Sequence, residues 1–150
     1  MVAYNSVSKS KLIAIVDDED DITNLFRDAL GTINDITIFA FTDPVMALEH
    51  FKINKENYVL VLSDLRMPGL TGMELIKSLK NMNRFVRTIL MTAFTINDDL
   101  FQEYTKKDLI NGFLQKLIHL DDLRAEVNNH LHTYESKNKS HSLKLREHHV

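Results

Sequence analysis

The sequence predicts an α/β domain in which an open, doubly wound parallel sheet of five strands is covered by five helices. Five short apolar runs alternate with five amphipathic stretches in a repeated strand-then-helix order. Right-handed crossovers convert that order into a parallel sheet with helices on both faces. The chain has 150 residues, enough for one such domain, whereas an eight-stranded barrel needs about 250.

The five predicted strands are short and apolar, and most are rich in β-branched or aromatic side chains. Such composition is typical of strands that are buried on both faces of a sheet. The runs are residues 12–16, 36–40, 58–62, 88–91 and 112–114.

The first three predicted helices have clear apolar stripes or start signals. The stripe of the first helix consists of Ile22, Leu25, Phe26, Ala29 and Leu30. Asp43 before Pro44 supplies an N-cap and a proline at the first position of the second helix. Thr71 and Glu74 have the spacing of a capping box, which opens the third helix.

The last two predicted helices depend on apolar spacing alone. Leu100, Phe101 and Tyr104 indicate a fourth, weaker helix. The stripe of the fifth consists of Leu120, Leu123, Val127 and Leu131. From about Glu135 onward no apolar period remains, so we expect a domain over residues 10–133 and a polar, disordered tail over residues 134–150.

Composition excludes several classes of protein. The chain has no cysteine, which rules out disulfides, thiolate zinc sites and a thiol nucleophile. No run approaches the roughly 18 apolar residues of a membrane span, and no signal peptide is visible, so we expect a cytoplasmic protein. The net charge of −3 provides no electrostatic footprint for nucleic acid. We expect the late histidines to lie on the surface: His119, His130, His132, His141, His148 and His149.

Polar residues follow four of the five predicted strands. Asp17 and Asp18 come after the first, Asp64 after the third, Thr92 after the fourth and Lys116 after the fifth. The carboxyl ends of parallel strands meet at one edge of a sheet, which is where ligands bind in open α/β folds. We therefore expect these side chains to share one crevice.

This set of side chains is suited to phosphoryl chemistry. Three carboxylates in one crevice repel one another, and a hard cation such as Mg²⁺ resolves the repulsion. Lys116 supplies a compact positive charge for a phosphate oxygen, and Thr92 supplies a hydroxyl donor. A metal, a carboxylate nucleophile, a lysine and a hydroxyl are the parts that move a phosphoryl group.

Four segments at these strand ends resemble the motifs of response-regulator receiver domains of two-component systems. They are IVDDE at residues 15–19, SDLRMPGLTG at 63–72, LMTA at 90–93 and FLQK at 113–116. The resemblance covers roughly residues 10 to 133. It implies a CheY-like, single-domain receiver with a flavodoxin-like sheet in the order 2-1-3-4-5.

The resemblance also implies a role for each residue of the crevice. Asp64 is expected to accept the phosphoryl group, and Asp18, Asp64 and the backbone carbonyl of Arg66 to ligate Mg²⁺. Asp17 is expected to reach the metal through a bound water. Thr92 is expected to hydrogen-bond the phosphoryl oxygen and Lys116 to form an ion pair with it; these roles match the motif positions in this chain.

Further positions are expected to tune the switch. Phe113 occupies the place of an aromatic residue that turns inward as Thr92 moves, and packing in the core without switching is the alternative interpretation. Ala93 is small and leaves the acceptor accessible, whereas Arg66 and Phe94 flank the pocket and are expected to affect how fast the phosphoryl group is lost.

One position departs from the family pattern. The family follows its lysine with a proline in a cis peptide bond, but Leu117 follows Lys116 here. A cis bond before a residue other than proline costs about 3–4 kcal/mol. The loop therefore either keeps a strained bond or adopts the trans form, which changes the aim of the lysine.

The resemblance implies a phosphoacceptor switch that takes a phosphoryl group from a histidine kinase or phosphotransfer protein. Such a protein promotes only its own phosphorylation and dephosphorylation. The protein is expected to signal through protein–protein contacts, without a DNA-binding domain and without a membrane. A homodimer that forms through the face of the last helix is one expected assembly. Two alternatives remain open: a degenerate receiver that only binds a partner, and a Mg²⁺-dependent phosphatase or hydrolase. Asp17 and Asp18 could also simply cap the first helix.

Overall fold

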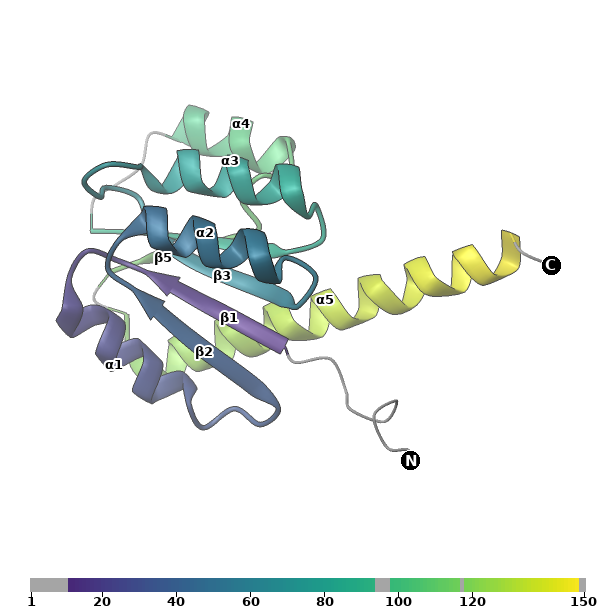
Figure 1. The fold of residues 1–150 in the computed structure, drawn as a ribbon, viewed down its shortest axis with the longest axis horizontal. Coiled ribbons are helices and arrows are strands. Elements are labelled where there is room, and N and C mark those ends of the chain that lie inside the picture. Colours follow the sequence, from purple (N-terminus) through teal and green to yellow (C-terminus); the bar gives the residue numbers. More distant parts are fainter. Residues whose placement is uncertain (1–10, 94–97, 117, 149–150) are drawn as a thin grey trace.

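The computed structural model describes residues 11–93, 98–116 and 118–148, which form a five-stranded parallel sheet and five helices (Figure 1). The strands are β1 (Lys11–Val16), β2 (Ile36–Phe41), β3 (Tyr58–Asp64), β4 (Arg87–Thr92) and β5 (Gly112–Gln115). The helices are α1 (Asp20–Leu30), α2 (Pro44–Asn54), α3 (Gly72–Met82), α4 (Asp98–Lys106) and α5 (Leu120–His148). The sheet order is β2-β1-β3-β4-β5, which confirms the predicted topology.

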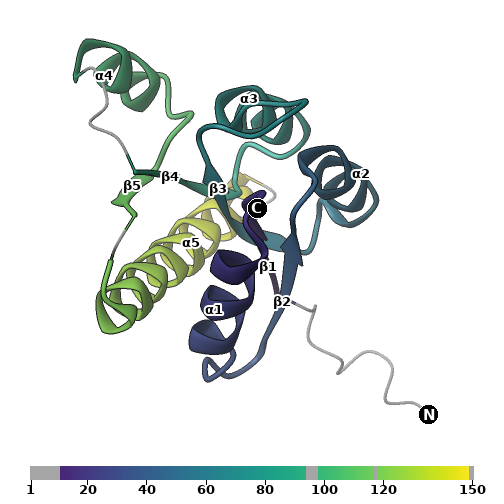
Figure 2. The ribbon, with the colours of Figure 1, turned by 90° about the vertical axis from the view of Figure 1, so that its left-hand side faces the viewer.

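The helices form two layers around the sheet. Helices α1 and α5 cover one face, and α2, α3 and α4 cover the other (Figure 2). The central strand β3 is buried along its whole length because helices cover it on both sides. The two apolar layers between sheet and helices form the core, as Leu60 and Leu62 show on the side of α1 and α5, and Val61 on the opposite side.

The strand register aligns the carboxyl ends of the strands. Val16 at the end of β1 pairs with Ser63 of β3, and Asp64 pairs with Met91 of β4. Thr92 pairs with Gln115 at the end of β5. Residues that immediately follow these ends therefore converge at one edge of the sheet.

Two of the predicted helix starts are confirmed in atomic detail. Asp43 Oδ1 accepts a hydrogen bond from the Val45 backbone N–H at 2.9 Å, with Pro44 at the first helical position. The Thr71 hydroxyl accepts from the Glu74 backbone N–H, and the Glu74 carboxylate accepts from the Thr71 N–H, each at 3.2 Å. The second pair is the reciprocal capping box.

The expected stripe of α1 is wrong at one position, Leu25, which is 47% exposed. The buried face of this helix is centred between Phe26 and Leu30, and it includes Thr23. Consecutive residues of an α-helix lie about 100° apart, so Leu25 is turned a full step away from Phe26 and faces outward.

The expectation that the late histidines all lie on the surface is wrong for His130. This residue of α5 is only 7% exposed, and its Nδ1 accepts hydrogen bonds from the Arg87 guanidinium at 3.1 and 3.3 Å. Gly112 of β5 explains the burial, because a Cβ at that position would lie 2.5 Å from His130 Nε2. The missing side chain leaves room for the ring.

Helix α5 is longer than expected. It continues to His148, whereas we expected a disordered tail from residue 134 (Figure 1). The stretch from Leu120 to His148 contains no glycine or proline, so nothing in it forces the helix to end. Glu135, beyond the expected boundary, also pairs with Lys11 of β1.

None of the helices in the described part of the chain combines the length and the apolar character needed to cross a membrane.

Candidate functional site

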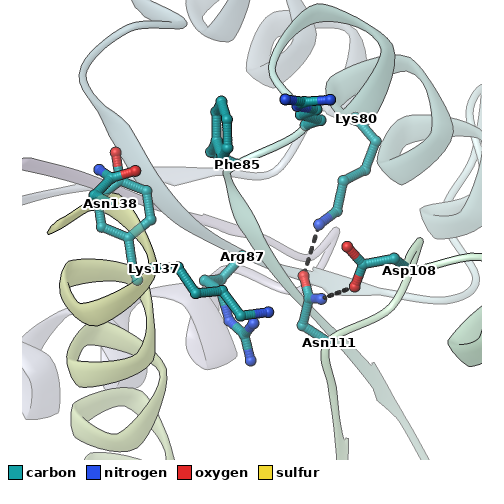
Figure 3. Close-up of a pocket in the computed structure, with 9 residues that line it drawn as sticks. Lys80, Phe85, Arg87, Asp108, Asn111, Lys137 and Asn138 are labelled. Atoms are coloured by element: carbon teal, nitrogen blue, oxygen red, sulfur yellow. Dashed lines mark hydrogen bonds between the residues drawn. The ribbon is translucent and has the colours of Figure 1, made fainter. Parts of the chain in front are cut away.

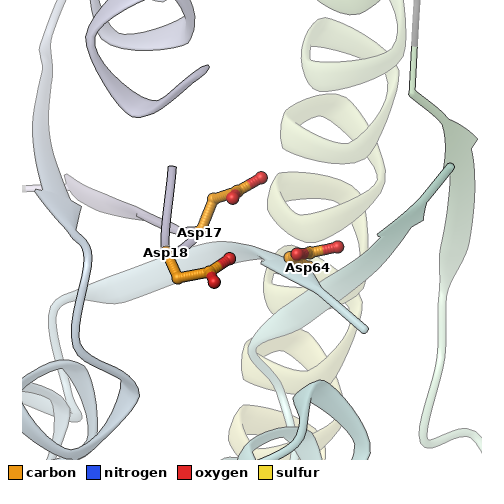
Figure 4. Close-up of side chains that lie close together, drawn as sticks. All are labelled: Asp17, Asp18 and Asp64. Atoms are coloured by element: carbon orange, nitrogen blue, oxygen red, sulfur yellow. The ribbon is translucent and has the colours of Figure 1, made fainter. Parts of the chain in front are cut away.

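The candidate site lies at the carboxyl edge of the sheet, where the ends of β1, β3, β4 and β5 converge. Asp17 and Asp18 follow β1 and Asp64 ends β3, as Figure 4 shows. Each of these three residues offers one carboxylate oxygen, and these oxygens lie within 4.8 Å of one another. Sequence positions separated by almost fifty residues thus form the predicted acidic cluster.

The three carboxylates differ in exposure. Asp17 is fully buried, Asp64 is 7% exposed, and Asp18 is exposed at the rim. The Asp17 backbone N–H donates to the Phe41 carbonyl at 3.1 Å, which ties the end of β1 to β2. The cluster therefore has a rigid inner wall and one side chain open to solvent.

Lys116 brings a positive charge into the cluster. Its Nζ lies 2.9 Å from Asp17 Oδ2 and 3.3 Å from Asp64 Oδ2. The Lys116 backbone N–H donates to the Thr92 carbonyl at 2.7 Å, so β4 holds the segment that carries the ammonium group. A third carboxylate, that of Glu19, lies 3.8 Å from Lys116 Nζ.

Burial and the neighbouring charges shift the pKa values of Asp64 and Lys116. Burial raises the pKa of Asp64, and the charge of Asp17 adds to the rise, while Lys116 partly opposes it. Burial by itself would lower the pKa of Lys116, but its contacts with Asp17 and Asp64 outweigh that effect and raise it. One ammonium group thus compensates the two inner carboxylates only in part.

The residues present fit a hard divalent cation. Although Lys116 pairs with it, the buried Asp17 Oδ2 has no hydrogen-bond partner of acceptable geometry among the described residues. A buried carboxylate oxygen without a hydrogen bond is costly, and coordination or a metal-bound water would satisfy it. The donors are all oxygens, the type that Mg²⁺ prefers.

The alternative that Asp17 and Asp18 cap the first helix is not what the geometry shows. Glu19 occupies the N-cap position of α1 and makes no side-chain capping bond to the described residues. Asp17 Oδ1 instead accepts from the Glu19 backbone N–H at 3.0 Å, which orients its second oxygen toward Lys116.

The loop between β3 and α3 holds the end of β3 in place. The Leu65 backbone N–H donates to the Met91 carbonyl, and the Gly72 N–H donates to the Leu65 carbonyl, both at 2.9 Å. Gly69 in this loop has a φ of +90°, a conformation that disfavours other residues. The loop therefore returns tightly and brings the start of α3 against Asp64.

The remaining predicted residues surround this cluster at different depths. Thr92 ends β4 and is 2% exposed, whereas Arg66 and Ala93 are exposed. Phe113 of β5 is half-buried and packs with a small apolar cluster that includes Tyr104 of α4. Two predicted positions, Phe94 and Leu117, lie outside the described residues.

Glu19 has no role among the predicted site residues, although it belongs to the acidic run that follows the first predicted strand. Its carboxylate adds a second acidic contact to Lys116 from the exposed side. The acidic run after the first strand indicates that a carboxylate lies at this edge of the sheet. No spacing rule shows which residue of the run contacts a lysine almost a hundred residues away.

Comparison with known proteins identifies relatives of this site and fold. The family model for the response regulator receiver domain matches residues 13–128. Sporulation initiation phosphotransferase F from Bacillus subtilis is 31% identical over 119 residues, which cover 79% of this chain and 92% of that protein. The cyclic di-GMP phosphodiesterase response regulator RpfG from Xanthomonas campestris is 29% identical over 137 residues, and the chain covers only 34% of its length.

Solved structures share the same fold. A CheY-like receiver domain protein from Methanospirillum hungatei superposes with a TM-score of 0.73 at 20% identity, over 85% of this chain and 98% of that chain. The signal receiver domain of an HD domain-containing protein from Pseudomonas fluorescens gives a TM-score of 0.74 at 20% identity, over 89% of this chain and 95% of that one. With the family match over residues 13–128, the chain belongs to the response-regulator receiver domains of two-component systems.

Proposed function

We propose that this receiver domain accepts a phosphoryl group on Asp64 from a histidine kinase or phosphotransfer protein and passes the signal on through protein–protein contacts. The observation that carries the proposal is the position of Asp64. Its carboxylate lies at the sheet edge, 3.3 Å from Lys116 and beside two further carboxylates. A Bacillus subtilis relative of similar length is named a phosphotransferase, which supports group transfer as the task of a chain of this size.

The chain's own residues divide the work of the transfer. An Asp64 oxygen would form the new bond to phosphorus as the donor's bond breaks, so the carboxylate must be ionised. Lys116 favours the charged form of Asp64, because it opposes the rise in the pKa of Asp64 that burial causes, and its ammonium group is placed to pair with an incoming phosphoryl oxygen. Thr92, at the end of β4, would donate its hydroxyl to another phosphoryl oxygen.

The oxygen donors of the site would hold Mg²⁺. Asp18, Asp64 and the backbone carbonyl of Arg66 would ligate it directly, and Asp17 would act through a water. Such a cation, when bound, supplies charge neutralisation for the transferring phosphoryl group. The exposed Asp18 and the buried Asp17 together leave the outer side of the cluster open to a phosphodonor.

Phosphorylation would act as a switch through Thr92 and Phe113. Phe113 of β5 pairs with Leu90 of β4 and packs against the same small apolar cluster as Tyr104 of α4. A movement of Thr92, which ends β4, would therefore alter this cluster. The surface built by α4, β5 and α5 would then present a different face to a downstream protein or to a second copy of the chain.

The test is the intact mass of the full chain after incubation with acetyl phosphate and Mg²⁺. We expect one added phosphoryl group in the wild type and in Asp28→Asn, a matched loss of one carboxylate on the exposed side of α1. We expect none in Asp64→Asn and none when Mg²⁺ is chelated. In Lys116→Ala we expect much slower addition, because the ion pair to Asp64 is lost.

Two outcomes would contradict the proposal. No addition to the wild type from acetyl phosphate or from a phosphorylated donor protein would favour a receiver that only binds a partner. Multiple turnovers on a small phosphoester, abolished by Asp64→Asn, would indicate a phosphatase or hydrolase.

Arg66 and Phe94 are proposed to shield the phosphoryl group from water. If the double variant Arg66→Asn, Phe94→Ala loses the phosphoryl group at the wild-type rate, these two side chains do not shield it.

A further inference from the structure

A second site lies at the opposite edge of the sheet, away from the acidic cluster. It is a pocket of about 310 Å³ between the end of α3, the starts of β4 and β5, and α5 (Figure 3). Its lining consists of Lys80, Arg84, Phe85, Arg87, Asp108, Asn111, Tyr134, Lys137 and Asn138. Arg87 begins β4 and Thr92 ends it, so the length of the strand, about 16 Å, separates the pocket from the phosphoacceptor site.

The pocket is strongly basic in a protein of negative net charge. Four cationic side chains line it, from α3, the loop between α3 and β4, the start of β4 and α5, against the single carboxylate of Asp108. Asp108 already accepts a hydrogen bond from Asn111 at 2.9 Å. Like charges gathered around a cavity repel one another unless an anion joins them.

The best-placed donor is Lys80. Its Nζ points into the pocket and donates to the Val86 carbonyl and to Asn111 Oδ1, both at 2.7 Å (Figure 3). An ammonium group has three N–H donors, so one is left for a ligand. Arg87 similarly directs two of its nitrogens to His130, and the rest of its guanidinium fork is available to the pocket.

The Lys80 charge is poorly compensated as it stands. Burial lowers the pKa of Lys80 to about 8, and the charges of Arg87 and Lys137 add to the fall, while Asp108 opposes it. A negatively charged ligand would remove this penalty by supplying the missing counter-charge.

The pocket also offers flat surfaces. The Phe85 ring is 37% exposed at the rim, and the Arg84 guanidinium lies 4.9 Å from its centroid. Tyr134 of α5 provides a second aromatic side chain. Aromatic and guanidinium planes beside basic donors suit a ligand that joins a planar ring to an anion.

We propose that this pocket binds a small phosphorylated ligand, with the phosphate held by Lys80, Arg87 and Lys137. Arginine and lysine are the side chains that proteins use for phosphate, and the volume lies at the lower end of the range of small-molecule sites. A free polyphosphate and a nucleotide share this chemistry, and Phe85 with Arg84 gives the nucleotide an additional contact through its base. The site is independent of the phosphoacceptor function at the other edge.

Isothermal titration calorimetry of the full chain, without Mg²⁺ and without a phosphodonor, tests the proposal with three probes: pyrophosphate, ADP and adenosine. We expect ADP to bind more tightly than pyrophosphate, and adenosine to bind weakly, with dissociation constants for the two anions of about 1 mM or below. Lys137→Ala and Arg84→Ala should each weaken ADP binding about tenfold. Lys52→Ala, which removes one exposed charge from α2, should leave it unchanged.

Backbone amide NMR separates this pocket from the acidic cluster. ADP should shift the amides of Asn111, Arg87 and Lys80 and should do so equally in Asp64→Asn. Absence of binding by both anions at low salt would overturn the proposal. So would equal weakening by Lys52→Ala and Lys137→Ala, or shifts confined to the phosphoacceptor edge. Binding of pyrophosphate as tight as that of ADP would retain the phosphate site and identify a free polyphosphate as the source.

Discussion

Replacing Gly72 with alanine tests how closely helix α3 approaches Asp64 at the end of β3. A Cβ built on Gly72 lies 2.2 Å from the Asp64 backbone oxygen, 3.0 Å from the Asp64 carbonyl carbon and 3.1 Å from the Leu65 Cα. All three neighbours are backbone atoms, so no side chain can rotate away. The first turn of α3 or the end of β3 must move instead.

The cost of that movement follows from the contact distances. The shortest contact is roughly 1 Å closer than nonbonded atoms tolerate, and the start of α3 is pinned by its capping box and by the bond from the Gly72 N–H to Leu65. Overpacking of this kind costs about 1–3 kcal/mol. Alanine's better helix propensity returns at most about 1 kcal/mol, so we expect Gly72→Ala to lower the free energy of unfolding by about 1–2 kcal/mol.

The same shift reaches the chemistry, because the crowded atoms belong to Asp64 itself. A displacement of about 1 Å at a reacting group can reduce a rate by up to about 100-fold. We therefore expect slower phosphorylation by acetyl phosphate, measured by intact mass, together with a lower urea midpoint measured by circular dichroism.

Gly31→Ala is the matched control. Its added Cβ would lie 3.2 Å from the Arg27 carbonyl oxygen, and its backbone has helical angles that alanine adopts readily. We expect a change within about 0.5 kcal/mol or a slight stabilisation, with an unaltered phosphorylation rate. If Gly72→Ala behaves like Gly31→Ala in both assays, the close approach of α3 to Asp64 is not what the structure indicates.

Two further predictions concern a helix cap and a buried histidine. Thr71→Ala removes the cap of α3 and should cost about 1 kcal/mol in urea unfolding, whereas Thr71→Ser should keep most of it; equal losses would refute the capping role. Burial and the charge of Arg87 lower the pKa of His130 from 6.5, against the opposing effect of Glu126. The unfolded chain therefore binds the proton first, and stability should fall as pH drops below 6.5, by at most about 1.4 kcal/mol per pH unit from this residue. His130→Asn should reduce that slope and the exposed His132→Asn should not; the reverse order would contradict it.

The element order and the acidic cluster could be predicted from the sequence because both depend on local signals. Apolar runs and helical stripes have short periods, and the capping pairs at Asp43 and Thr71 act within three residues. Parallel connectivity then brings together whatever follows the strands, so Asp17, Asp18 and Asp64 meet without any further information.

The exceptions to local prediction have particular physical causes. Leu25 fits the stripe by spacing, but the direction in which a helix faces its sheet depends on packing. His130 is polar and lies on a long polar helix, yet it is buried because Gly112 on another element leaves space for its ring. Helix α5 continues beyond its apolar stripe, and no glycine or proline interrupts it there.

By itself, the sequence determined the five-stranded order, the helix starts and the residue types gathered at the carboxyl edge, because these depend on neighbours along the chain. Only the tertiary structure decided that Glu19 turns back toward Lys116 and adds a third carboxylate beside its ammonium group. It also decided that Lys80, Arg84, Arg87 and Lys137 surround a single pocket at the other edge. Both depend on side-chain packing between residues up to about a hundred positions apart, which no local pattern records.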